Sequence, residues 1–400
     1  MRPYFLILVA SAGTLAACIK RLDFHCEQDS NCDQSGGGVC TTAGTGNRWC
    51  AYPDLNCPAG YRYSNQEVGD GVSGSCVTAV EIDAGVDGQI PDTGGPPATS
   101  CLAVPYTCGA SSNDNCCNSP KVTGGAYYRS NDSANDVNSG DRSAPAMVSS
   151  FRLDKYEVTV GRFRAFVTQG LGTQANHPAV GAGTHANIPG SGWEASWNTN
   201  LAADTPALVA AIKCNSSLQT WTDAPGPSEN RPMNCINWYE AMAFCAWDGG
   251  YLPTEAEWNY AATGGAEQRA YPWSSPASSL VLDSSRASYN DGTGCIGDGM
   301  PACTLPDLLE VGSKPAGDGR WGQSDLAGNV WEWVLDWPTS YVVPCTDCAN
   351  LIQPSYIPLT RAVRGGDFEV DGSGLRTGYR SAFEQSRRTY SHGVRCARAP

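Results

Sequence analysis

Hydrophobic residues recur at helical spacing in only a few short segments of the chain, and the first of these follows Thr159. Val160, Phe163 and Phe166 are three residues apart, which places them on one face of a helix. Thr159 can cap this helix, because its side-chain oxygen can accept a hydrogen bond from an early backbone N–H. The pattern predicts a helix that ends at Val167.

Two further helices are indicated by their first residues. Asn237 is followed three residues later by Glu240, and Thr254 is followed at the same spacing by Glu257. In this arrangement the two side chains each bond to the backbone N–H of the other residue, which stabilises the first turn. A glycine pair follows each segment and predicts its end.

The other hydrophobic segments are short, β-like and separated by glycine and proline. Examples are residues 149–156, 331–335 and 362–364. Strands and helices do not alternate regularly, so the pattern does not favour a parallel sheet with crossover helices. We expect an α+β fold with small antiparallel sheets, few short helices and much irregular chain.

The N-terminal segment is typical of an exported protein. Arg2 precedes a short apolar stretch within residues 1–17, which is characteristic of a signal peptide. The stretch ends in residues 15–18, Leu-Ala-Ala-Cys, which resemble a bacterial lipobox with Cys18 as the lipidated residue. Cleavage near Ala17 by an ordinary signal peptidase is the alternative. Acylation would anchor the chain to the cell envelope, and Ile19 favours the outer membrane.

The chain contains 19 cysteines, and their distribution predicts its domain organisation. Without Cys18 they fall into clusters of six, four and eight, and even numbers fit disulfides closed within each cluster in an oxidising compartment. We expect a disulfide-rich module at 18–78, a flexible linker rich in Pro, Gly and Asp at 79–100, and a large domain at 101–400.

Composition excludes several functional classes. There are 26 basic and 40 acidic residues, a net charge of −14, and nucleic-acid binding is not expected from so acidic a chain. The four histidines are scattered and the cysteines lack zinc-site spacing. No apolar run reaches the ~20 residues that a membrane-spanning helix needs.

Several motifs, in this order, resemble those of the formylglycine-generating enzyme (sulfatase-modifying factor) family. They are residues 151–167, 232–262, 271–273, 325–337, 364–366 and 393–396. The resemblance implies a C-type-lectin-like α+β fold. Active members are copper-dependent oxidases that convert a sulfatase cysteine to formylglycine. A related branch belongs to iron-dependent sulfoxide synthases, whose histidine-rich bundle has no counterpart in this sequence.

The resemblance also locates the family's two copper-binding cysteines, and this chain lacks both. Their positions correspond approximately to Val370 and Leu375, and Asp367 replaces the usual serine. No cysteine occurs between Cys348 and Cys396, so a shift in the alignment does not change this result. Because Cu(I) prefers soft sulfur ligands, we do not expect copper to bind or a family catalytic residue to remain.

A calcium site is a second implication of the resemblance. Asp325 and Glu332 offer carboxylates, and Gly328 and Val330 offer backbone carbonyls, which are the hard oxygen donors that Ca²⁺ takes. The alternative is a pair of acids beside a tryptophan-rich core. A second calcium site would begin near Asn290.

Two disulfides are expected in the large domain. The family resemblance implies a bridge between Cys245 and Cys396. Cys345 and Cys348 form a Cys-x-x-Cys pair, which we interpret as a structural disulfide, with a redox pair or a displaced copper site as the alternatives.

The C-terminal segment 361–398 carries eight arginines and four acidic residues. The arginines either bond internally or form a surface for an anionic or carbohydrate-like ligand. The candidate ligand contacts are Trp331, Trp333, Phe368, Glu369, Asp371 and Arg376.

Two functions follow from these observations. The first is a lectin-like module that binds an extracytoplasmic glycan, peptide or protein, and the second is a divergent oxidoreductase.

Overall fold

The structure is a computed structural model that describes residues 26, 32, 39–43, 47–54, 56–57, 61–64, 71–77, 98–102, 107–131, 142–355 and 358–400. The predicted signal peptide, the lipidation site at Cys18 and most of the predicted linker lie outside these residues. Among the described residues, no helix has the length and apolar character that crossing a membrane requires.

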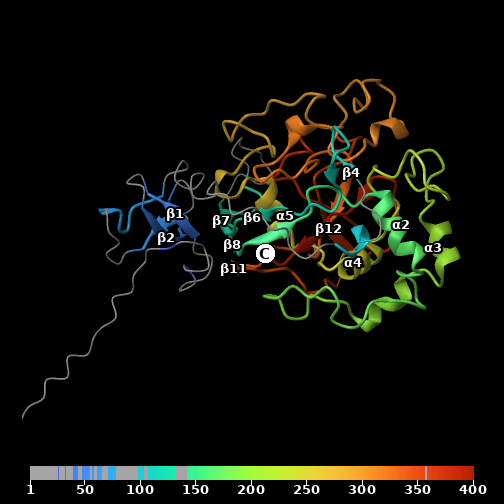
Figure 1. Cartoon of the computed structure of the whole chain (residues 1–400), viewed down its shortest axis with the longest axis horizontal. Helices are drawn as coiled ribbons and strands as arrows, with labels where there is room; N and C mark the ends of the chain where they lie inside the picture. The colour runs from blue at the N-terminus through green and yellow to red at the C-terminus, as the bar shows by residue number, and fades with distance from the viewer. Residues whose placement is uncertain are drawn as a thin grey trace, which may run out of the picture.

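The N-terminal module contains a three-stranded antiparallel sheet in the order β1-β2-β3. Its strands are β1 (Val39–Thr42), β2 (Arg48–Pro53) and β3 (Tyr61–Tyr63). The sheet lies beside β7, β8 and β11 of the large domain (Figure 1). The hydroxyl of Tyr61 of β3 meets the large domain at Gly125: a Cβ placed on Gly125 would lie 2.6 Å from the Tyr61 oxygen and 2.7 Å from the Tyr260 oxygen. The module therefore contacts the large domain through at least this residue.

The three helices predicted from the sequence are all present. They are α2 (Val160–Thr168), α4 (Trp238–Trp247) and α5 (Glu255–Ala262), and Thr159 caps α2 while capping boxes begin α4 and α5. One more helix, α3 (Thr205–Ala211), is capped by Asp204 and was not predicted. Short 3₁₀ helices occupy Thr99–Cys101, Ala195–Asn200, Gly265–Glu267, Leu305–Asp307 and Pro315–Gly317.

Four small sheets complete the large domain, in the orders β13-β12-β10-β14, β11-β8-β7, β15-β9-β6 and β4-β5. Most pairs are antiparallel as predicted, but β10–β14 and β11–β8 are parallel. The strands are β4 (Thr107–Cys108), β5 (Asp114–Asn115), β6 (Lys121–Val122), β7 (Gly125–Tyr128), β8 (Pro145–Val148), β9 (Phe151–Leu153), β10 (Trp331–Trp333), β11 (Cys345–Thr346), β12 (Thr360–Arg364), β13 (Ser381–Glu384), β14 (His392–Gly393) and β15 (Ala397–Arg398). The α+β prediction is confirmed.

Nine disulfides join the eighteen cysteines that follow Cys18, and each closes within its own sequence cluster. The predicted Cys245–Cys396 bridge is present, with a Cα–Cα distance of 5.4 Å across 151 residues of sequence. It fastens α4 to the chain just before β15, inside the main hydrophobic core.

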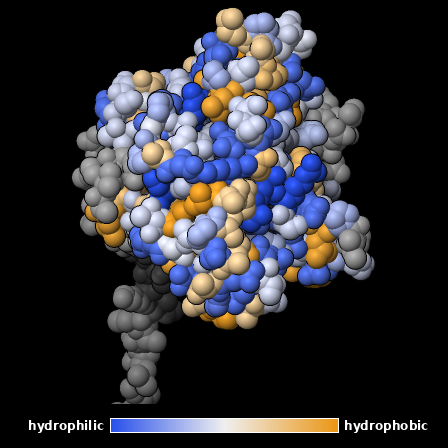
Figure 2. Space-filling model, turned by 90° about the vertical axis from the view of Figure 1, so that its right-hand side faces the viewer, coloured by the Kyte–Doolittle hydropathy of each residue, from blue (hydrophilic) through white to orange (hydrophobic). Residues whose placement is uncertain are grey.

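The face of the molecule drawn in Figure 2 carries both hydrophilic and hydrophobic residues. On the face that lies at the right of Figure 1, where α2 and α3 are drawn, hydrophobic residues form small groups between hydrophilic ones. A broad apolar area typical of a protein or membrane contact is not visible in this view.

Candidate functional site

Val370 and Leu375, where the resemblance places two copper-binding cysteines, lie close together in the loop that follows β12. Gly365 and Gly366 adopt positive φ angles of 97° and 79° and turn the chain. A Cβ placed on Gly366 would lie 3.0 Å from Val370 Cγ2 and 2.5 Å from Leu375 Cδ2. The side chains of Val370 and Leu375 therefore both pack against the same glycine.

Apolar side chains fill this place. Leu375 is fully buried in a cluster with Tyr271, Tyr289 and two alanines, and Val370 packs against the same cluster. Tyr271 in turn stacks on Trp273, with ring centroids 5.0 Å apart. Methyl groups and aromatic rings thus occupy the region that two thiolates would need, and they offer copper no sulfur ligand.

Asp367, which replaces the family's serine, has a local structural contact. Its Oδ1 accepts hydrogen bonds from the backbone N–H groups of Glu369 (2.9 Å) and Val370 (3.0 Å). Burial raises the pKa of Asp367 to about 6. The side chain therefore fixes the first turn of the loop.

Three of the predicted ligand contacts are wrong, because the structure buries their aromatic side chains. Trp331 and Trp333 lie on β10, an inner strand of its sheet, and both pack in the main core. The Nε1–H of Trp333 donates to the carbonyl of Ile236 at 3.2 Å. Phe368 has no exposed surface and packs against Val330. These side chains stabilise the core and cannot contact a ligand.

The polar candidates of the same loop lie nearer the surface. Glu369 is half-buried and accepts a hydrogen bond from the Tyr390 hydroxyl at 3.0 Å. Asp371 is exposed and accepts two hydrogen bonds from Ser373, while Arg376 is half-buried. The structure brings these three side chains to one loop, but two of them hold that loop together.

Most of the C-terminal arginines bond internally, as one of the two interpretations predicted. Five of them pair with carboxylates of the large domain: Arg364 and Arg380 with Glu255, Arg388 with Glu240, Arg395 with Glu332, and Arg398 with Asp154 and Asp248. These arginines are not available as a ligand surface.

The predicted calcium loop is irregular, but its two carboxylates have different surroundings. Both oxygens of Glu332 accept from the buried guanidinium of Arg395, at 2.6 and 2.7 Å, and Trp258 Nε1 also donates at 2.7 Å. Asp325 accepts from the Gly312 N–H at 2.6 Å, and burial raises its pKa to about 6. The prediction of Glu332 as a ligand is therefore corrected, because its oxygens are bound by cationic and neutral donors.

Asp325 and the backbone carbonyls of Gly328 and Val330 belong to the class of oxygen ligands that Ca²⁺ takes. Near the predicted second site, the Asn290 side-chain oxygen accepts from the Gly292 N–H at 2.9 Å. Calcium stays a prediction at both places.

The Cys345–Cys348 pair forms a disulfide with a Cα–Cα distance of 5.3 Å. Cys345 is buried at the start of β11, and Arg129 Nη1 lies 3.4 Å from the Cys348 sulfur. This environment agrees with the predicted structural bridge.

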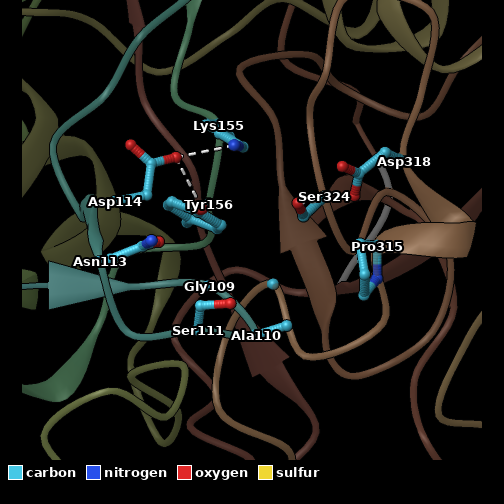
Figure 3. A pocket seen from close by; sticks show the side chains of 11 residues that line it. Gly109, Ala110, Ser111, Asn113, Asp114, Lys155, Tyr156, Pro315, Asp318 and Ser324 are labelled. Carbon is cyan, nitrogen blue, oxygen red and sulfur yellow. Dashed lines mark hydrogen bonds and ion pairs between the residues drawn. The ribbon is translucent and has the colours of Figure 1, made fainter.

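A polar cavity of about 420 Å³ lies elsewhere on the large domain, and the sequence did not indicate it. Figure 3 shows Asp114, Lys155 and Tyr156 on one wall and Asp318 and Ser324 on the opposite one. Asp114 Oδ2 accepts from Lys155 Nζ at 2.7 Å and from the Tyr156 hydroxyl at 2.8 Å. The walls come from segments up to 215 residues apart, so no local motif could reveal the cavity.

The charges of this cavity do not balance. Burial opposes ionisation of Asp114, but hydrogen bonds from Lys155 and Tyr156 outweigh it and hold the pKa of that carboxyl below its usual value. Asp318 has no ion-pair partner among the described residues, and it accepts a hydrogen bond from the Ser324 hydroxyl at 2.7 Å. Burial raises the pKa of Asp318. The cavity therefore presents an ammonium group and two carboxyl groups to a small ligand.

Comparison with known proteins places the large domain in one family. The profile of the sulfatase-modifying factor enzyme 1-like domain matches residues 110–400. The formylglycine-generating enzyme of Thermomonospora curvata is 27% identical over 275 residues, which cover 63% of this chain and 83% of that enzyme.

Two other similar proteins differ in name and extent of the match. The hercynine oxygenase of Mycobacterium tuberculosis is 28% identical over 285 residues, which cover 66% of this chain and 57% of that protein. The structure of PvdO from Pseudomonas aeruginosa is 18% identical, with a TM-score of 0.49, and the match covers 76% of this chain and 100% of that one.

Proposed function

The chain belongs to the sulfatase-modifying factor enzyme 1-like family, and from this premise we propose that it is a ligand-binding member rather than a copper oxidase. The observation that carries the proposal is the pair Val370 and Leu375. These side chains pack against Gly366 and an apolar cluster where the resemblance places two copper-binding cysteines. Without a pair of thiolates, Cu(I) has no soft ligand set.

The polar cavity supports a binding role. Its volume of about 420 Å³ lies within the range of ~300–1,000 Å³ that is common for small-molecule sites. Asp318, which has no ion-pair partner among the described residues, can receive a cationic group of the ligand. Lys155 retains donor capacity beside its bond to Asp114, since an ammonium group has three N–H donors. We propose a small polar ligand that carries an amino group.

The proposed place of action is the cell envelope. Nine disulfides fit an oxidising compartment, and the lipobox-like segment before Cys18 supports a lipid anchor. The outer membrane is the proposed membrane, and the ligand is extracytoplasmic. Changing Cys18 to Ser should release the protein from the membrane fraction, and unchanged fractionation together with an unchanged mass would contradict the anchor.

A divergent oxidoreductase is the second candidate, because similar proteins are named formylglycine-generating enzyme and hercynine oxygenase. Copper binding distinguishes the two functions. We expect a Cu(I) chelator to remove copper from the purified protein. We also expect the protein to leave the cysteine of a Cys-x-Pro-x-Arg peptide unchanged in air, as measured by mass spectrometry.

A double variant, Val370→Cys with Leu375→Cys, provides the positive control for copper. Both side chains reach the same glycine, so two thiols there should bind Cu(I) more tightly than either single variant does. Tight copper binding or aldehyde formation by the unmodified protein would overturn the proposal in favour of the oxidoreductase.

The cavity is tested separately with arrays of glycans and peptides that carry amino groups. The unmodified full-length protein first identifies the compounds that bind. Changing Asp318 to Asn should then abolish binding of these compounds. Changing Asp223 to Asn, an exposed carboxylate outside the cavity, is the matched control and should have no effect. Equal binding by all three proteins would show that the cavity is not the ligand site.

A further inference from the structure

Arg361 differs from the other buried arginines of the C-terminal segment. It lies on β12 with 3% of its surface exposed, and its guanidinium carbon stands 3.9 Å from the ring centroid of Trp238 and 3.7 Å from that of Trp337. Trp197 lies at the side, 6.0 Å away. The cation is therefore held between two aromatic faces, which is a favourable geometry for a guanidinium.

Its hydrogen-bond partners are neutral. Nη1 donates to the Leu335 carbonyl at 2.7 Å, and Nε donates to the Gln385 side-chain oxygen at 3.3 Å. Within the described part of the chain Arg361 has no ion pair, and no hydrogen bond involves its Nη2. Arg364 and Arg395, which are equally buried, each have a carboxylate partner.

A buried cation without a carboxylate partner is unusual, because the loss of hydration is normally offset by an opposite charge. Burial lowers the pKa of Arg361 to about 9. Asp336, a buried carboxylate that interacts electrostatically with Arg361, is bound by the backbone N–H groups of Glu255 and Asn350, at 2.7 and 2.6 Å. The fold thus leaves the charge of Arg361 only partly compensated.

A small cavity meets Arg361 at this point. Its volume is about 80 Å³, and its lining includes Arg361, Ser191, Glu194, Trp197, Trp337 and Gln353. Trp197 is half-buried, while Glu194 and Gln353 are exposed at the rim. A cavity of this size admits one small polar group and excludes a whole sugar ring.

We propose that this cavity binds the carboxylate group of a ligand through the guanidinium of Arg361, which the rings of Trp238 and Trp337 hold in place. A guanidinium matches a carboxylate because its planar N–H groups can reach both oxygens. The carboxylate would supply the charge that the fold does not. The site is separate from the cavity around Asp318, so it does not depend on the function proposed above.

The exposed carboxylate of Glu194 allows a test of the direction in which a nearby negative charge changes carboxylate binding. It faces the same cavity and interacts electrostatically with Arg361. It therefore weakens the attraction of Arg361 for an anion, although solvent screens the effect. Changing Glu194 to Gln should tighten carboxylate binding about twofold, whereas a ligand that needs Glu194 as a hydrogen-bond acceptor would bind less well.

The test uses the full-length protein and acetate as the probe, with binding measured by saturation-transfer difference NMR of its methyl signal. Acetamide, a neutral compound of the same shape, is compared in parallel. Sodium chloride at physiological strength is present throughout, so that any general preference for anions is already satisfied. We expect a saturable acetate signal with a millimolar dissociation constant and no signal from acetamide.

Changing Arg361 to Met should weaken acetate binding at least tenfold, and Arg361→Lys, which keeps the charge but not the planar donors, should weaken it several-fold. Arg387→Met removes an exposed arginine of the same segment and should have no effect. Circular dichroism checks that the variants are folded. If Arg361→Met does not fold, acetate binding by Arg361→Lys tests the proposal instead. Equal binding of acetate and acetamide, or unchanged binding in a folded Arg361 variant, would overturn the proposal.

Discussion

The ion pair of Arg395 and Glu332 provides a sharp test of what holds the large domain together. Two guanidinium nitrogens of Arg395 donate to Glu332, at 2.6 and 2.7 Å, and both side chains are fully buried. The same guanidinium donates to the carbonyls of Asp154, Lys155 and Ser324, at 3.1, 3.1 and 2.8 Å. One side chain thus joins β10 to the segment that follows β9 and to the loop before β10.

Changing Arg395 to Met would leave a buried carboxylate without its cation. Burial together with the nearby Asp325 and Glu332 already raises the pKa of Glu157 well above its usual value, so the region is rich in acidic groups. Removing one partner of a buried pair typically costs about 3–5 kcal/mol. In a domain of this size, such a loss corresponds to a fall in Tm of roughly 10 °C.

The assay is denaturant unfolding of the full-length protein, with Arg395→Met, Glu332→Gln and the double variant measured together. We expect the double variant to recover at least about 2 kcal/mol of the sum of the two single losses, because it contains no unpaired charge. Arg387→Met, an exposed change, should lie within about 0.5 kcal/mol of the unmodified protein. A single loss below about 1 kcal/mol, or strictly additive losses, would refute the reasoning.

Three further predictions concern stability. Replacing Cys245 and Cys396 by Ala should lower the free energy of unfolding by about 5 kcal/mol, because the bridge closes a loop of 151 residues; a loss under about 1 kcal/mol in denaturant unfolding would contradict this. Burial lowers the pKa of His185, but the hydrogen bond that its Nε2–H donates to Glu257 outweighs burial and raises the pKa above its ordinary value of 6.5. The stabilisation should therefore be complete below pH 6.5 and disappear as pH rises through the raised value. His185→Gln should remove this pH dependence of Tm, and identical profiles would argue against it. If calcium binds through Asp325, EGTA should lower the Tm and Asp325→Asn should abolish the difference; a Tm that EGTA does not change would exclude calcium at this loop.

The helices could be predicted because their signals are local. Thr159, Asn237 and Thr254 each satisfy backbone N–H groups within three residues, and the structure shows all three bonds. The helix capped by Asp204 begins with the same kind of signal, but its seven residues are too few to show a clear periodicity. Local chemistry therefore predicts where a helix begins more reliably than hydrophobic spacing does in so irregular a chain.

The candidate site was harder to predict because it depends on contacts between distant segments. Trp331 and Trp333 were predicted as ligand contacts beside the C-terminal arginines, but β10 has neighbouring strands on both sides and its tryptophans share the main core with residues of α4. Trp258 of α5 donates to Glu332 between them. The carboxylates that pair with the C-terminal arginines lie more than 60 residues away along the chain. Neither the burial of an aromatic residue nor the partner of an arginine can be determined from spacing alone.

The loop after β12 is fixed by contacts that do not involve the side chains of Val370 and Leu375, where the resemblance places copper ligands. Asp367 holds the first turn through the backbone of Glu369 and Val370, and that backbone contact is independent of the side chain at position 370. Val370 and Leu375 both pack closely against Gly366, which has no side chain, and they fill the space beside it. The arginine before the glycines is anchored by Glu255. A scaffold whose stability is independent of its reaction centre can retain the fold while another surface takes over the function. This is why the cavities around Asp318 and Arg361, and not the surroundings of Val370 and Leu375, should be tested for ligands.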